Sequence, residues 1–161
     1  MKLKDLGAAS MLKRALATDV DLVVAFESVV MNEKLYGKPL DHTAARLEID
    51  TNEYYLNLSD GRVVATGALR RREDGSTYLS NIAVHPGVRR KGFARAMMIH
   101  LLSLCNRAPS IDLAVHPETQ AAHALYVSLG FIPTHIEENF FGDGEPRVVM
   151  RCVRGAKALV A

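Results

Sequence analysis

The chain has 161 residues, the length of one ordinary domain, and 48% of them are hydrophobic. Its net charge of +2 is too small for a general nucleic-acid binder. No apolar run approaches the ~20 residues of a membrane-spanning helix, and the opening segment lacks the apolar core of a secretory signal. We therefore expect one soluble domain over residues 1–161, located in the cytoplasm, with residues 1–10 as a loose extension.

The first third of the chain predicts one strand and two helices. Residues 12–30 read as a short strand and a helix, with Thr18 as N-cap and Asp21 in the capping-box position. Residues 41–50 predict the second helix.

The sequence period then changes to that of strands. Asp-Gly pairs at 60–61 and 74–75 separate three strand-like runs, and glycine tolerates the positive φ that tight hairpin turns require. We expect an antiparallel meander of strands near 53–59, 62–70 and 77–84.

The second half alternates helices and strands. A helix that starts near Arg90 ends before Pro109, and a strand over 111–115 precedes a helix that Gly130 closes. Two last strands follow, over 131–140 and 146–153. The predicted order β-α-α-β-β-β-α-β-α-β-β is a mixed α/β fold. Cys105 and Cys152 are expected to be buried thiols.

A basic corner, HPGVRRKGFA at 85–94, connects the third strand of the meander to the next helix. The first backbone N–H groups of a helix have no intrahelical partner and attract phosphate. Gly92 removes a side chain where an anion would approach, and Ala94 keeps the next contact small. The corner therefore predicts a diphosphate site; the alternative is a solvated charge run in which Gly92 is only a turn residue.

Two motifs resemble one family. The segment 84–95, VHPGVRRKGFAR, resembles the [QR]xxGx[GA] acetyl-CoA signature of the GNAT superfamily, the acetyl-CoA-dependent N-acetyltransferases. The segment 122–131, AHALYVSLGF, resembles that superfamily's AxxLYxxxGF motif. The resemblance runs from about Leu12 to Arg151. It implies a mixed, mainly antiparallel sheet of about seven strands flanked by about four helices.

The resemblance also implies roles for individual residues. Amides of the basic corner would hold the pyrophosphate of acetyl-CoA, the preceding strand would pair with its pantetheine arm, and one strand amide would face the acetyl carbonyl. Tyr126 matches the family's catalytic acid; the alternative is a core aromatic residue. The implied cofactor-binding residues are Ile82, Ala83, Val84, Arg89, Arg90, Lys91, Gly92, Phe93, Ala94, Arg95 and Thr119.

The catalytic base is less well defined by the sequence. Within the superfamily the chain is most similar to the ribosomal-protein N-terminal alanine acetyltransferases, which usually carry glutamate where this chain has Ala114. If Ala114 points into the site, strand alternation puts Asp112 and His116 on the same face. His116 is then a candidate base, with a surface histidine as the alternative.

Other acidic or polar candidates are weaker. Tyr78 and Ser80 are expected to share a face with Ile82, where many relatives have an acid, and neither is acidic. Glu137 and Glu138 could attract a cationic amine or could simply be exposed. No metal is expected, because no His, Cys, Asp or Glu residues have the spacing of metal ligands.

The expected acceptor is a primary amine, either of a small molecule or of a peptide N-terminus, and a homodimer is left open. Phe140 and Phe141 replace tyrosines whose hydroxyls would contact a peptide backbone. This replacement predicts that the preferred acceptor is a small amine with an apolar portion and not the N-terminus of a ribosomal-protein peptide. The competing class of function is a non-catalytic acyl-CoA-binding or sensing domain.

Overall fold

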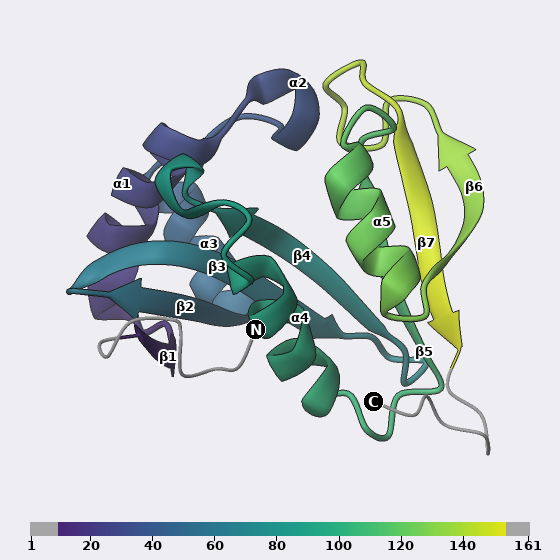
Figure 1. Ribbon diagram of the computed structural model, residues 1–161, viewed down its shortest axis with the longest axis horizontal. Helices are drawn as coiled ribbons and strands as arrows, with labels where there is room; N and C mark the ends of the chain where they lie inside the picture. Colours follow the sequence, from purple (N-terminus) through teal and green to yellow (C-terminus); the bar gives the residue numbers. More distant parts are fainter. Residues whose placement is uncertain (1–9, 154–161) are drawn as a thin grey trace.

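A seven-stranded sheet runs through the computed structural model, which describes residues 10–153 (Figure 1). The strand order is β1-β2-β3-β4-β5-β7-β6. Every neighbouring pair is antiparallel except β4 and β5. The strands are β1 (Ser10–Arg14), β2 (Glu53–Ser59), β3 (Arg62–Arg71), β4 (Thr77–Val84), β5 (Ser110–Val115), β6 (Ile132–Glu137) and β7 (Arg147–Val153).

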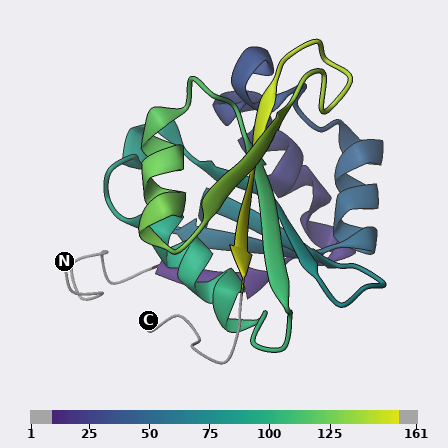
Figure 2. The ribbon, with the colours of Figure 1, turned by 90° about the vertical axis from the view of Figure 1, so that its right-hand side faces the viewer.

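Helices cover both faces of this sheet (Figure 2). They are α1 (Val20–Val30), α2 (Glu33–Tyr36), α3 (His42–Thr51), α4 (Phe93–Ser103) and α5 (Gln120–Ser128), with short 3-10 turns at Ala17–Asp19 and Pro86–Val88. On one face α1 and α3 bury Phe26 and Ala45 against the sheet. On the other face α4 and α5 contribute Met97 and Tyr126 to a second core cluster. The predicted mixed, mainly antiparallel fold is confirmed.

The predicted meander is confirmed as β2, β3 and β4. Asp60 and Gly61 have φ of 51° and 74°, as a tight hairpin turn requires, and Gly75 has φ of 86°. Cys105 and Cys152 are buried in the core as thiols, also as predicted.

The beginning of the chain differs from the prediction in three ways. Thr18 does not cap α1, because a 3-10 turn precedes the helix and the Asp19 carboxylate accepts the N–H of Leu16 at 2.8 Å. The four-residue helix α2 is too short to leave a periodic pattern in the sequence. Ser10 already belongs to β1, and the rest of the predicted loose extension lies outside the described residues.

Candidate active site

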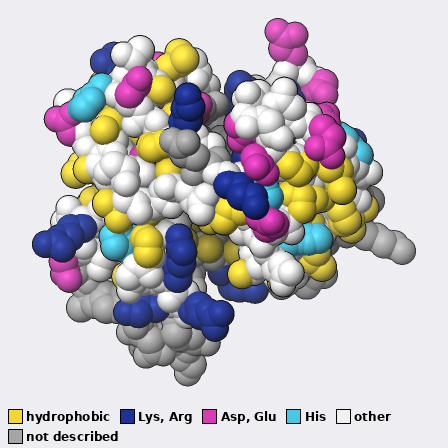
Figure 3. All heavy atoms as spheres, turned by 90° about the horizontal axis from the view of Figure 1, so that it is seen from above, with side chains coloured by type: hydrophobic (Ala, Val, Ile, Leu, Met, Phe, Trp, Pro, Cys, Tyr) yellow, Lys and Arg dark blue, Asp and Glu magenta, His cyan; other side chains and the backbone are white. Residues whose placement is uncertain are grey.

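A cleft opens where the two central strands separate. β4 and β5 pair only at Thr77 with Ile111 and at Tyr78 with Asp112. After Tyr78, no strand in the described part of the chain pairs with the edge of β4 that faces β5. The opening is a cleft of about 1020 Å³, lined by residues from both faces of the sheet. In space-filling view it is a groove between two halves of the molecule, with Lys and Arg side chains beside it (Figure 3).

A β-bulge in β4 shapes the wall of this cleft. Thr66 pairs with Ala83, whereas Ala68 pairs with Ser80, so β4 contains one extra residue. Asn81 takes a positive φ of 55°, and its carbonyl accepts the Thr66 hydroxyl at 2.7 Å.

The bulge inverts the alternation of side chains along β4. Leu79 and Ile82 therefore belong to the same core cluster. The prediction that Tyr78 and Ser80 share a face with Ile82 is wrong for this reason.

The basic corner forms a helix N-terminus on the α4 and α5 side of the cleft, and no side chain caps it. α4 begins at Phe93 and not near Arg90, because Arg90 and Gly92 have φ of 65° and 87°, which a right-handed helix excludes. The first intrahelical bond runs from Ala96 N–H to the Gly92 carbonyl at 3.0 Å. The preceding N–H groups thus lack intrahelical partners, and the first turn holds no acidic residue.

This corner fits a diphosphate. Successive amides in a segment with alternating backbone handedness make an anion-binding concavity, and the helix dipole favours negative charge there. Along β4, the edge that faces away from β3 leaves backbone groups of Ile82 to Val84 open to an extended ligand.

Most of the predicted site residues line the cleft, and Lys91 does not. Arg95 lines it while it donates to the Ser128 hydroxyl of α5 at 3.0 Å. The residues that line it are Ile82, Ala83, Val84, Arg89, Arg90, Gly92, Phe93, Ala94, Arg95, His116, Thr119 and Tyr126. The Thr119 hydroxyl is buried with no protein hydrogen-bond partner, so it has capacity for a ligand.

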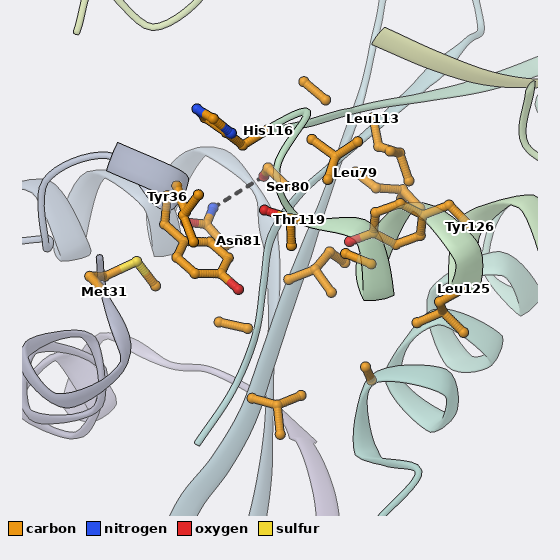
Figure 4. A pocket seen from close by; sticks show the side chains of 18 of the residues that line it. Met31, Tyr36, Leu79, Ser80, Asn81, Leu113, His116, Thr119, Leu125 and Tyr126 are labelled. Carbon is orange, nitrogen blue, oxygen red and sulfur yellow. Dashed lines mark hydrogen bonds between the residues drawn. The ribbon is translucent and has the colours of Figure 1, made fainter. Parts of the chain in front are cut away.

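Two tyrosines face each other across the cleft (Figure 4). The Tyr126 ring is 6% exposed and packs edge-to-face on Phe131, and its hydroxyl points into the cleft. Tyr36 of α2 points its hydroxyl into the same space. Burial raises the pKa of Tyr126 above that of a free phenol, and a charge on Tyr36 or Tyr78 would raise it further. The phenol of Tyr126 therefore holds its proton at neutral pH.

His116 lies in the cleft wall but has both ring nitrogens engaged. Its Nδ1 accepts the Glu118 N–H at 3.1 Å, and its Nε2 lies 2.8 Å from Glu145 Oε2. The residue is only 3% exposed, so the surface alternative is wrong. Its ring points away from Tyr126 (Figure 4). Asp112, predicted on the same face of β5, lies outside the cleft lining and pairs with Arg72 and Arg151, each at 2.7 Å.

An acidic pair on the α1 and α3 side was not predicted. Glu27 of α1 and Glu48 of α3 both line the cleft. Burial, and then the charge of Glu48, raises the pKa of Glu27 to about 7, although a hydrogen bond from the Leu40 N–H opposes the shift. The only sequence signal was a glutamate among the buried positions of α1, beside Phe26 and Val30.

Two further segments contribute side chains to the cleft lining. Leu35, Tyr36 and Lys38 line it from α2 and the following loop, and Phe141 lines it from the loop before β7. The Lys34 ammonium contacts Glu118 at 2.9 Å, which links α2 to the turn after β5. Glu137 and Glu138 are exposed and lie outside the cleft lining, so the predicted alternative of simple exposure holds.

The comparisons identify the family. The profile of the acetyltransferase (GNAT) family matches residues 24–131. The chain belongs to this family. It is thus an acetyl-CoA-dependent N-acetyltransferase, as the two motifs predicted, and the enzyme is favoured over the non-catalytic binding domain. In the described part of the chain no group of His, Cys, Asp or Glu could hold a metal ion, and no helix has the length and apolarity to cross a membrane.

Two curated relatives agree with the family. The [ribosomal protein bS18]-alanine N-acetyltransferase of Escherichia coli K12 is 35% identical over 100 residues, which cover 59% of this chain and 67% of the relative. The Salmonella typhimurium LT2 protein of the same name is 36% identical over 94 residues, 55% of this chain and 63% of that one.

Three solved structures share the fold. The Escherichia coli ribosomal-protein-S18-alanine N-acetyltransferase has a TM-score of 0.74 at 23% identity, covering 94% of this chain and 99% of that one. Ard1 of Thermoplasma volcanium has a TM-score of 0.80 at 19% identity, with coverages of 91% and 98%. The yncA protein of Salmonella typhimurium, solved with its cofactor acetyl-CoA, has a TM-score of 0.74 at 16% identity, with coverages of 96% and 99%.

Proposed function

We propose that the chain acetylates the free α-amino group of a protein or peptide N-terminus in a ternary complex with acetyl-CoA. The observation that carries this proposal is one cleft that passes through the sheet, from the amide corner at α4 to the α1 and α3 side. Two substrates can enter such a cleft from opposite faces and meet where β4 and β5 separate. The named activity of the bS18-alanine N-acetyltransferases supports a protein N-terminus as acceptor.

The chain's own groups would hold acetyl-CoA along this path. The amides from Arg89 to Ala94 would bind the pyrophosphate, with the charge of Arg95 beside them. The open edge of β4 from Ile82 to Val84 would pair with the pantetheine arm, and the Thr119 hydroxyl would take a further hydrogen bond. Bound acetyl-CoA supplies the thioester that the amine attacks.

Two groups would then serve acetyl transfer directly. A backbone N–H of β4 near the bulge would stabilise the oxyanion that forms at the acetyl carbonyl. Tyr126 would donate its proton to the departing sulfur, because its phenol stays protonated at neutral pH and points into the cleft.

The base role predicted for His116 stays a prediction, and it requires one of the imidazole's two hydrogen bonds to break. In the present arrangement His116 connects the turn after β5 with the loop before β7 through Glu118 and Glu145. A histidine held in this way orders two loops of the cleft.

One observation favours a second acceptor, a small amine with an apolar portion. The Phe141 ring is 53% exposed, lines the cleft and lies 4.9 Å from the Arg147 guanidinium. It offers a peptide backbone no hydroxyl, whereas it offers apolar surface to an aryl or alkyl group.

A competition experiment decides between the two acceptors. With acetyl-CoA limiting, a peptide that begins with alanine competes with free amino acids and aryl-alkyl amines, and mass spectrometry counts the acetylated products. We expect the peptide to be acetylated several-fold faster than any small amine, because a longer acceptor contacts both α2 and the loop before β7. If the small amine is acetylated faster than the peptide, the acceptor is instead a small amine with an apolar portion, as Phe140 and Phe141 predict.

A further inference from the structure

Glu27 and Glu48 line the α1 and α3 side of the cleft, and among residues 10–153 neither carboxylate forms an ion pair. The Glu27 side chain is 2% exposed, its Oε2 accepts the Leu40 N–H at 3.2 Å, and its Oε1 is buried without a hydrogen-bond partner. A buried carboxylate with an unsatisfied oxygen costs folding free energy. Such a group in the wall of a substrate cleft has capacity for a proton or a donor that a ligand brings.

Glu48 is fixed beside the bulge of β4. Its Oε2 accepts the side-chain amides of Asn52 at 2.6 Å and Asn81 at 3.1 Å. The second amide comes from the residue whose positive φ makes the bulge. The carboxylate of Glu48 is therefore tied to the strand segment that is proposed to face the acetyl group.

We propose that Glu27 and Glu48 bind the ammonium group of the acceptor and take up the proton that the amine must lose before it attacks. This assignment rests on the proposed function in one respect, the entry of the acceptor amine from the α1 and α3 side of the sheet. It supplies a carboxylate to the cleft, whereas the β5 residue Ala114, which lines the cleft, has none.

The surroundings of Glu27 favour its protonated form. Glu27 faces Glu48 from α3, the phenol of Tyr54 from β2 and the Leu40 N–H from the loop before α3. None of these groups is a cation, and the charge of Glu48 raises the pKa of Glu27. The raised pKa of Glu27, about 7, agrees with a carboxylate that takes up a proton near neutral pH.

The proton balance of the reaction closes with this pair and Tyr126. One N–H bond of the ammonium breaks, its electron pair stays on nitrogen, and the proton goes to the acidic pair and later to solvent. The nitrogen lone pair then forms the C–N bond, and the C–S bond breaks. Tyr126 gives its proton to the sulfur and regains one from the nitrogen, so both protein groups return to their starting states.

The test compares Glu27→Gln and Glu48→Gln with the unchanged enzyme. Glutamine keeps the size of the side chain and an oxygen that accepts the Leu40 N–H, but it cannot take up a proton. We expect kcat/KM for an alanine peptide to fall about 100-fold at pH 7 in either variant, the loss typical of a removed general base. Acetyl-CoA affinity by calorimetry should not change. Asp21→Asn is the matched control, because that carboxylate is also on α1 and its side chain is 90% exposed.

The shape of the pH profile separates proton uptake from packing. In the unchanged enzyme kcat/KM should rise as Glu27 deprotonates and fall as the amine deprotonates near ~8. In Glu27→Gln only the neutral amine reacts, so kcat/KM should rise through the amine's own pKa without the fall. A structural role would lower the profile without changing its shape.

A second nucleophile completes the test. The same peptide with an aminooxy group in place of its α-amino group is already neutral at pH 7, so Glu27→Gln should acetylate it nearly as fast as the unchanged enzyme does. Equal losses for both nucleophiles, or a pH profile that changes in His116→Gln and not in the glutamine variants of the pair, overturn the proposal. If no peptide is an acceptor, the proposed function fails, and the pair is tested with the amine that the competition identifies.

Discussion

Gly92→Glu should abolish detectable binding of acetyl-CoA while the fold remains intact. Gly92 is the N-cap of α4. The backbone amides that are proposed to hold the pyrophosphate converge at this position. A carboxylate at this position puts like charge beside the diphosphate and fills its space. Two like charges in contact cost several kcal/mol of binding free energy, and a loss of about 3 kcal/mol already weakens binding roughly 100-fold. Isothermal titration calorimetry measures the affinity, and circular dichroism checks the fold.

Two controls separate the anion site from backbone strain. Gly92 has φ of 87°, so any side chain there adds strain of about 1 kcal/mol. Gly61→Glu introduces the same charge at φ of 74° in the β2–β3 turn, with open space around the new side chain, and should leave binding unchanged. Arg89→Ala should weaken binding less than Gly92→Glu, because backbone amides provide most of the contact. Unchanged affinity in folded Gly92→Glu would contradict the assignment.

The sequence brings together the residues of the proposed cofactor half of the cleft because that half is local in the chain. The residues from Ile82 to Arg95 form one strand, one turn and one helix start, so their order along the chain is nearly their order in space. The Asp-Gly turns are local signals of the same kind. Even here the helix start was placed too early, since the positive φ of Arg90 has no signature in the residue type.

The acceptor half could not be predicted because it depends on pairings between distant segments. The bulge at Asn81 exists only relative to β3, and it reverses which side chains of β4 face the cleft. Glu27 and Glu48 lie on different helices and meet only after α1 and α3 pack on the sheet. His116 was correctly placed in the cleft, but the partners that engage its ring come from the turn and loop at 118 and 145.

Tyr126→Phe should lower kcat strongly, about 100-fold, with little change in acetyl-CoA affinity. The hydroxyl is expected to act only on the departing sulfur, and loss of a general acid typically costs at least this factor. Phenylalanine keeps the ring that packs edge-to-face on Phe131 at 6.2 Å, so the core on this side of the sheet should be preserved. Steady-state kinetics of thiol release give kcat, and calorimetry gives the affinity.

The matched control for Tyr126 is another buried phenol. Tyr55 of β2 is 9% exposed and packs edge-to-face on His100 at 4.7 Å, away from the cleft lining. Tyr55→Phe should leave both kcat and acetyl-CoA affinity unchanged. Because an acid is needed only once the C–S bond breaks, a leaving group more acidic than a thiol should rescue Tyr126→Phe. An acetyl donor with such a leaving group should narrow the difference in kcat between Tyr126→Phe and the unchanged enzyme. Parallel losses of affinity and turnover in Tyr126→Phe would instead assign the phenol to packing and contradict its role as the acid.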